Sequence, residues 1–142
     1  MKWYFLKSIF TGALFLSASA AQAQLAIIVN PSNPIGVLSM EETRDIYLGK
    51  KNHFPNGEVA IPVDQSEESI DRHSFYKKVI KKEAGQIKAY WAKLVFANRG
   101  TPPEVIGTAP EVKAWVASHK EAIGYIDDSL LDLSVKLVSM VP

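Results

Sequence analysis

The chain has 142 residues, a formal net charge of +1 and no cysteine. This length suits one domain with a single core and leaves no room for a second domain of ordinary size. A nearly neutral chain lacks the basic excess typical of nucleic-acid-binding proteins, and the absence of cysteine excludes a disulfide framework and thiolate metal ligands.

Residues 1–23 are typical of a secretory signal peptide. Two lysines lie at or before position 7, an apolar run covers residues 9–16, and Ala21 and Ala23 fit a small-x-small cleavage site. The apolar run is too short to span a bilayer. Cleavage after Ala23 would leave residues 24–142, which is 142 less 23 or 119 residues, and would lower the formal charge from +1 to −1 by removing two lysines. We therefore expect a periplasmic protein with no membrane span after cleavage.

The first part of the mature chain predicts a strand followed by a capped helix. The apolar run from Leu25 to Asn30 is typical of a strand buried on both faces, and two Asn-Pro pairs end it. Ser39 and Glu42 have the S-x-x-E spacing of a capping box, so a helix is predicted from Ser39 to Leu48. Gly49 favours its termination, since glycine readily adopts positive φ.

The rest of the chain alternates strands with helices. Val59–Asp64 is predicted as a strand. A second helix is predicted over about residues 69–82, and Gly85 is expected to break it. Residues 87–95 are predicted as a third helix, because apolar residues recur at i, i+3, i+4, i+7 and i+8. Residues 101–107 are predicted as a loop.

The C-terminal part adds a helix and two strands. Thr108 and Glu111 predict another capped helix, and residues 122–126 and 135–138 predict the closing strands. The expected fold is α/β, a single three-layer lobe with a mostly parallel sheet flanked by helices.

Several short motifs resemble phosphate-type periplasmic solute-binding proteins. The second lobe of that family begins with a pattern close to N-P-x-N-P, then L-S, I-[FY]-x-G-K, an aromatic and N-G. The matching motifs here are Asn30-Pro31, Asn33-Pro34, Leu38-Ser39, Ile46-Tyr47, Gly49-Lys50, Phe54 and Asn56-Gly57. Ala122–Ile126 also resembles the family strand A-I-G-Y-[VI]. The resemblance implies one lobe of a type 2 periplasmic-binding fold over residues 24–142.

The resemblance also implies a ligand site near the start of the second helix. Family members carry a stretch like R-x-[DE]-G-S-G-T-[RS]-x-x-F there, which holds an oxyanion. The chain reads Q-S-E-E-S-I-D-R-H-S-F. Gln65 replaces the arginine, which removes a charged ligand for the anion. Glu68 replaces a glycine and Asp71 replaces the threonine, so two negative charges lie close to the expected anion. The expected ligand-binding residues are Gln65, Ser69, Ile70, Asp71 and Arg72. The alternative is a purely structural role, with Ser69 as a helix cap and Arg72 as a surface partner of Glu68. In that case Glu67, Glu68 and Asp71 compensate the helix dipole.

Two functions remain open. The first is a periplasmic phosphate or oxyanion binder that acts in uptake or sensing, with weak affinity unless a second lobe, a homodimer or an envelope protein closes over the ligand. The second is a protein-interaction adaptor, a partner of a sensor or porin, whose ligand site has degenerated. The four lysines at positions 77, 78, 81 and 82 are either a solvated face or a docking surface.

Enzymatic activity is not expected. There is no G-x-S-x-G elbow, no glycine-rich phosphate loop, and no metal-ligand spacing among His53, His73 and His119. No catalytic residue, metal or cofactor is therefore predicted.

Overall fold

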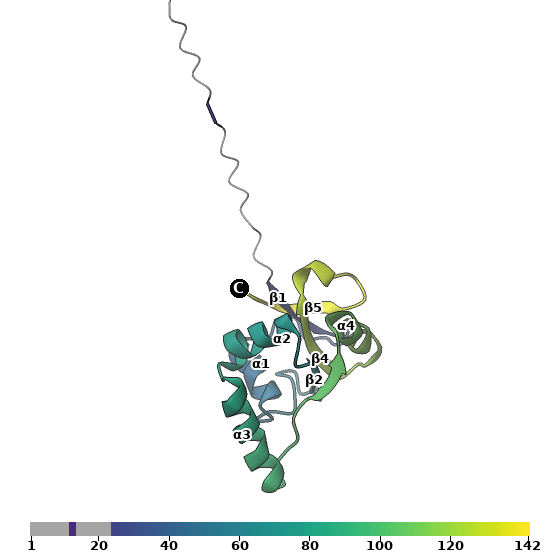
Figure 1. Ribbon diagram of the computed structural model, residues 1–142. Coiled ribbons are helices and arrows are strands. Elements are labelled where there is room, and N and C mark those ends of the chain that lie inside the picture. The colour runs from purple at the N-terminus through teal and green to yellow at the C-terminus, as the bar shows by residue number, and fades with distance from the viewer. Residues whose placement is uncertain (1–11, 14–23) are drawn as a thin grey trace, which may run out of the picture.

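A five-stranded sheet forms the centre of the domain (Figure 1). The structure is a computed structural model that describes residues 12–13 and 24–142, so the predicted signal peptide lies almost wholly outside the described residues. The strand order is β3-β2-β4-β1-β5. The strands are β1 Leu25–Val29, β2 Ile61–Gln65, β3 Glu104–Gly107, β4 Ala122–Asp127 and β5 Lys136–Val141.

The sheet is mixed. Strand β2 pairs in parallel with both β3 and β4, whereas β1 pairs antiparallel with both β4 and β5. Four strands therefore run in one direction and β1 alone runs against them. The expected single α/β lobe is confirmed, and the predicted mostly parallel sheet holds for strand direction but not for every neighbouring pair.

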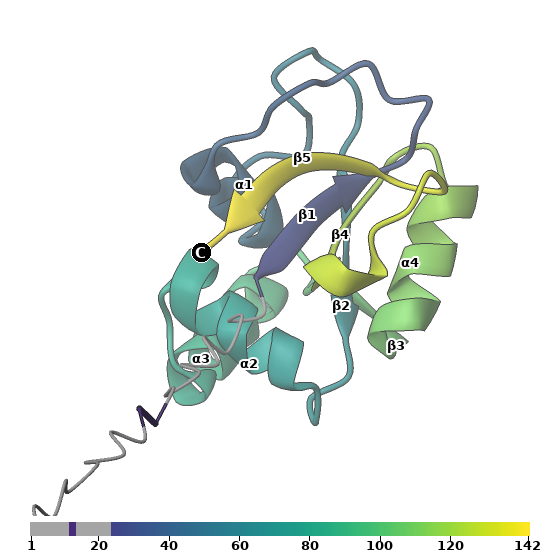
Figure 2. The ribbon, with the colours of Figure 1, turned by 90° about the horizontal axis from the view of Figure 1, so that it is seen from above.

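Helices cover both faces of the sheet, which gives the expected three layers (Figures 1 and 2). Alternate residues of β1 face opposite cores, as the pleat of a strand requires. Ile27 and its same-face neighbours pack against α1, α2, η1 and α3, while Ala26 and Ile28 pack against α4. The helices are α1 Met40–Tyr47, α2 Ile70–Phe75, η1 Tyr76–Ile80, α3 Ala84–Phe96 and α4 Ala109–Ser118, with a short η2 at Asp128–Leu130.

The helix caps follow the sequence signals. The Ser39 hydroxyl accepts a hydrogen bond from the Glu42 amide at 3.0 Å, and the Thr108 hydroxyl accepts one from the Glu111 amide at 3.4 Å. Gly49 has φ 70°, in the left-handed region that glycine adopts without strain. These motifs therefore set the first residue of α1 and of α4 and the end of α1.

The break before α3 lies elsewhere than predicted. The helix that begins with α2 continues into η1 and ends at Lys81, which has φ 58°. Gly85 lies inside α3, so the prediction that it breaks the helix is wrong. Nothing in the local sequence marks a lysine for positive φ.

Residues 101–107 are not wholly loop, because β3 occupies Glu104–Gly107. This edge strand is short, and Val105 is 52% exposed, so it carries little of the apolar periodicity that predicts a strand. Its parallel pairing with β2 places the ends of both strands side by side. The helices that follow them, α2 and α4, begin at the same edge.

Candidate functional site

A hollow of about 490 Å³ lies where α2 and α4 begin, beyond the ends of β2 and β3. Its lining combines hydroxyls, carboxylates and helix N-termini from Gln65, Ser66, Glu68, Ser69, Ile70, Asp71, Thr108 and Ala109. In α/β sheets ligands gather at this edge. Four of the five residues predicted to bind ligand therefore line one hollow, and the fifth, Arg72, does not.

Gln65 and Ser69 hold each other in place. The Gln65 side chain is buried and donates from Nε2 to the Tyr125 carbonyl at 2.8 Å. The Ser69 hydroxyl donates to Gln65 Oε1 at 2.5 Å and accepts from the Arg72 amide at 3.2 Å. Ser69 is thus the N-cap of α2, and a ligand that used its hydroxyl would compete with bonds inside the protein.

Arg72 points to Asp64 instead of Glu68. Its Nε lies 3.7 Å from Asp64 Oδ2, and its guanidinium lies 5.0 Å from the centre of the Tyr76 ring. Burial alone would lower the pKa of Arg72, but Asp64 and the neighbouring tyrosines outweigh burial and raise it. The alternative pairing with Glu68 is therefore not the one formed, and the positive charge of Arg72 is balanced by a buried carboxylate.

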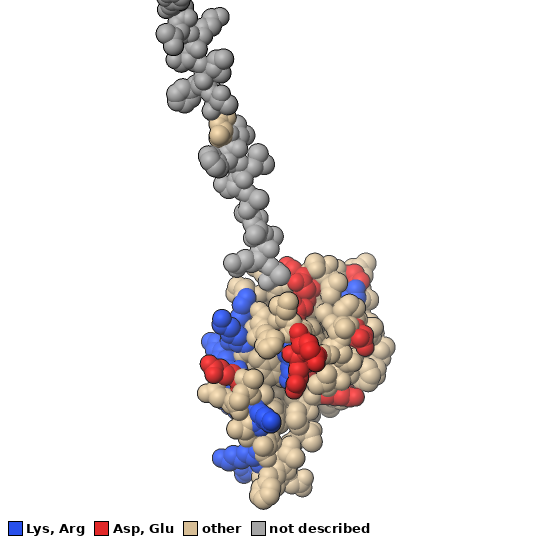
Figure 3. Space-filling model, viewed as in Figure 1, with Lys and Arg blue, Asp and Glu red and all other residues tan. Residues whose placement is uncertain are grey.

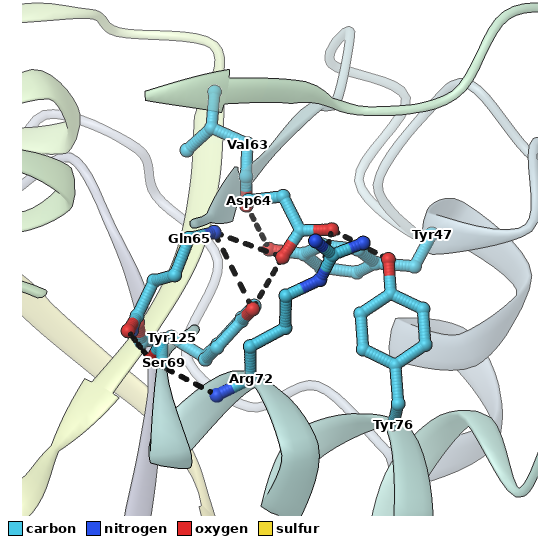
Figure 4. A network of polar contacts seen from close by, with 8 residues as sticks. All are labelled: Tyr47, Val63, Asp64, Gln65, Ser69, Arg72, Tyr76 and Tyr125. Atoms are coloured by element: carbon cyan, nitrogen blue, oxygen red, sulfur yellow. Dashed lines mark hydrogen bonds and ion pairs between the residues drawn. The ribbon is translucent and has the colours of Figure 1, made fainter. Parts of the chain in front are cut away.

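Asp64 is the centre of a polar network next to the hollow (Figure 4). The Tyr76 hydroxyl donates to Asp64 Oδ2 at 2.5 Å, and the Tyr125 hydroxyl donates to Oδ1. Tyr47 lies beside them and donates to the Val63 carbonyl at 2.8 Å. Burial, followed by the charge of Asp64, raises the pKa of all three tyrosines.

Sequence analysis missed this network. Its members lie far apart in the chain, since Asp64 and Tyr125 are 61 positions apart. An aspartate at the end of the predicted strand Val59–Asp64 is the only local signal, because an aspartate that a strand carries into the core needs partners.

Backbone donors remain open at the hollow. Within residues 24–142, no hydrogen bond satisfies the amides of Ile70 and Asp71 at the start of α2 or of Ala109 at the start of α4. Free amides at helix N-termini attract anions. The Ile70 side chain itself is 84% exposed.

Carboxylates oppose this attraction. Glu68 and Asp71 line the hollow. Partial burial and then the nearby charge of Asp127 raise the pKa of Asp71. The hollow therefore offers backbone donors and hydroxyls for an anion, but lies in a negative field.

Over residues 12–13 and 24–142, no group of three or more His, Asp or Glu side chains could hold a metal ion. In the same part of the chain, no helix is long and apolar enough to cross a bilayer.

Comparison with known proteins gives a consistent fold. No family model matches the chain. No curated protein matches it either. Among solved structures it is similar to an ABC-type phosphate transport receptor from Vibrio cholerae, with 23% identity and a TM-score of 0.67. It is also similar to a Clostridium perfringens protein assigned as a phosphate ABC transporter substrate-binding protein with bound phosphate, with 22% identity and a TM-score of 0.67.

A third similar structure, PstS from Borrelia burgdorferi, has 15% identity and a TM-score of 0.63. Each of the three matches covers 82% of this chain and 44–47% of the other protein. The chain thus spans less than half the length of these proteins. It has the fold of one lobe of a phosphate-type periplasmic binding protein, as the sequence motifs predicted.

Proposed function

We propose that this protein is a periplasmic solute-binding lobe that binds a small oxyanion, phosphate above all, in the hollow between α2 and α4. It acts in uptake or sensing. The bound phosphate of the similar Clostridium perfringens protein supports the ligand class. The bound anion would accept hydrogen bonds from the amides of Ile70, Asp71 and Ala109.

The convergence of two helix N-termini on one hollow carries the proposal. The helix formed by α2 and η1 and the helix α4 both begin there, so their positive dipole ends and free amides face the same space. Ser66 also lines this hollow, as does Thr108, whose hydroxyl donates to Glu111 Oε1 at 3.0 Å. Donors from separate elements thus surround a volume large enough for a small anion.

Weak affinity is expected from the isolated lobe. The hollow is open to water, and its own carboxylates, Glu68 and Asp71, repel an anion. A partner that closes over the hollow would strengthen each hydrogen bond by excluding water. A second lobe, a second copy of this chain or an envelope protein would each provide such a cover.

Titration calorimetry with inorganic phosphate tests the proposal. Asp71→Asn should tighten binding by about fivefold to tenfold, because it removes a negative charge beside the ligand. Glu121→Gln, on an exposed residue outside the hollow, is the matched control and should leave the affinity unchanged. The proposal fails if neither the wild type nor Asp71→Asn gives heat at millimolar phosphate.

A second candidate is a periplasmic adaptor that docks on an envelope protein, such as a sensor or porin. Two features of the ligand edge favour it. The side chains of Gln65, Ser69 and Arg72 are bonded to other groups of the same chain, and the Ile70 side chain is 84% exposed. Ile70→Ser should then abolish capture of a defined envelope partner. An unchanged capture would reject the adaptor.

A further inference from the structure

Charge is divided unevenly between two parts of the domain. Residues 76–99, which form η1 and α3 and their flanks, carry seven basic residues and one acidic residue. The rest of residues 24–142 carries seven basic and fourteen acidic residues. The basic residues of residues 76–99 are Lys77, Lys78, Lys81, Lys82, Lys88, Lys93 and Arg99. We call this set the basic surface.

The basic surface faces solvent. Six of its seven residues are exposed, and Lys82 is half-buried, with its Nζ 5.7 Å from the centre of the Tyr90 ring. Within residues 24–142, none of the seven forms an ion pair. Figure 3 shows blue side chains along the left side of the molecule and down its lower projection, while most red side chains lie on the rest of that face. These charges are available to a partner.

An apolar end lies next to these cations. At the C-terminal end of α3, Phe96 is 95% exposed and Val95 is 51% exposed. Ile87 and Trp91, on the inner side of the helix, are buried and fix α3 to the core. Figure 1 shows that this end of α3 projects beyond the sheet. A nearly bare phenylalanine therefore stands at a projecting end, in the same short stretch as Lys93 and Arg99.

We propose that the basic surface and the end of α3 dock on an anionic lipid bilayer. Lipid phosphates would contact the lysines, and Phe96 would enter the boundary between headgroups and acyl chains, as amphipathic interfacial segments do. An acidic protein would account for the cations, but not for an exposed phenylalanine among them. A bilayer offers anionic groups and hydrocarbon in one surface, and a projecting helix end reaches it without needing a matching cavity.

This docking is independent of the oxyanion site. No residue that lines the hollow between α2 and α4 belongs to residues 76–99. The residues that would contact lipid are therefore not those that would hold the anion.

Cosedimentation with large vesicles tests the proposal. The mature chain should bind vesicles of phosphatidylcholine with about one third phosphatidylglycerol, should bind pure phosphatidylcholine much more weakly, and should lose affinity as salt rises. Lys93→Glu should weaken binding by about fivefold or more, since each basic residue near an anionic surface contributes about this factor. Phe96→Ser should weaken it by a comparable factor.

The chain offers a matched control for each variant. Lys120→Glu makes the same charge change at an exposed lysine outside the basic surface, and Leu133→Ser removes an apolar side chain that is 98% exposed elsewhere. Both should bind as the wild type does. Failure of the wild type to bind anionic vesicles at low salt would overturn the proposal, as would equal losses in the controls. So would binding to soluble polyglutamate that Phe96→Ser leaves intact, because that result identifies an acidic polypeptide as the partner.

Discussion

At the scale of single residues, Asp64 determines the shape of the ligand edge. Its buried carboxylate accepts hydrogen bonds from Tyr76 and Tyr125 and balances the charge of Arg72. A buried carboxylate without such partners would cost several kcal/mol. The network therefore keeps the arginine turned away from the hollow and leaves ligand contact to backbone amides and hydroxyls.

Tyr125→Phe should lower the free energy of unfolding by about 1–3 kcal/mol, because Asp64 Oδ1 loses one of its two donors and keeps only the Gln65 amide, while the ring stays packed on Phe75. Urea unfolding followed by circular dichroism measures this change. Tyr90→Phe, which removes a partly buried hydroxyl outside the network, is the comparison and should cost less. Equal stability of Tyr125→Phe and the wild type would show that the hydroxyl contributes nothing.

The tyrosines also predict alkaline sensitivity. The pKa of Tyr47, Tyr76 and Tyr125 is raised above the ordinary value of 10.0, so these phenols keep their protons in the folded chain while the unfolded chain releases them. The contribution of these protonated phenols to the free energy of unfolding is therefore fully present below pH 10, and it is lost as the pH rises above 10. The slope should approach about 1.4 kcal/mol per pH unit for each protonated tyrosine.

Denaturant unfolding between neutral pH and strongly alkaline pH, with tyrosinate absorbance recorded in parallel, checks this expectation. Tyr125→Phe should have a shallower loss of stability above pH 10, since one of the three groups is gone. An identical slope in the variant would contradict the assignment.

At the scale of elements, short sequence motifs correctly predicted the features that depend on neighbouring residues, such as helix caps. The caps at Ser39 and Thr108 and the strand from Leu25 are where the sequence indicates. The edge strand β3 and the left-handed Lys81 were missed, because parallel pairing and tertiary packing fix them rather than periodicity. The candidate site shows the same contrast. The role of Ser69 as a helix cap could be predicted from neighbouring residues, whereas the role of Asp64 could not, because its partners are distant in sequence.

The contact between α4 and β4 depends on one small residue. A Cβ at Gly124 would lie 2.9 Å from Val112 Cγ1 and 3.0 Å from Val116 Cγ2. Gly124→Ala should therefore push α4 from the sheet and lower the free energy of unfolding by about 1–3 kcal/mol, measured by urea unfolding. Adding Val112→Ala should recover part of the loss, because it makes room for the new methyl group. A double variant no more stable than Gly124→Ala would argue against this contact as the cause.

At the scale of the whole molecule, two cores share one sheet. One lies beneath α1, α2, η1 and α3 and the other beneath α4, with β1 contributing to both. All five residues of β1 are buried. The layer order was predictable from alternating strands and helices, but the direction of β1 was not, because it depends on pairing with strands about 100 residues away.

Removal of β5 should abolish cooperative folding. A chain that ends at Val135 lacks the strand that covers one side of β1 and loses the buried side chains of Val138 and Val141. Thermal melting by circular dichroism should show no sharp transition for this truncation, whereas removal of Pro142 alone should leave the transition intact. A sharp melt of the truncated chain near the wild-type temperature would contradict this expectation.

The place of β1 has a consequence for biosynthesis. The strand leaves the ribosome before every other described element, yet its two partners, β4 and β5, are translated last, and Leu25 pairs with Asp127 and Val141. No stable sheet around β1 can exist while translation is under way, because closing such long loops precedes any gain from pairing. A nascent chain in this condition has no sheet around β1, so its apolar first strand stays unpaired until β4 and β5 have been made.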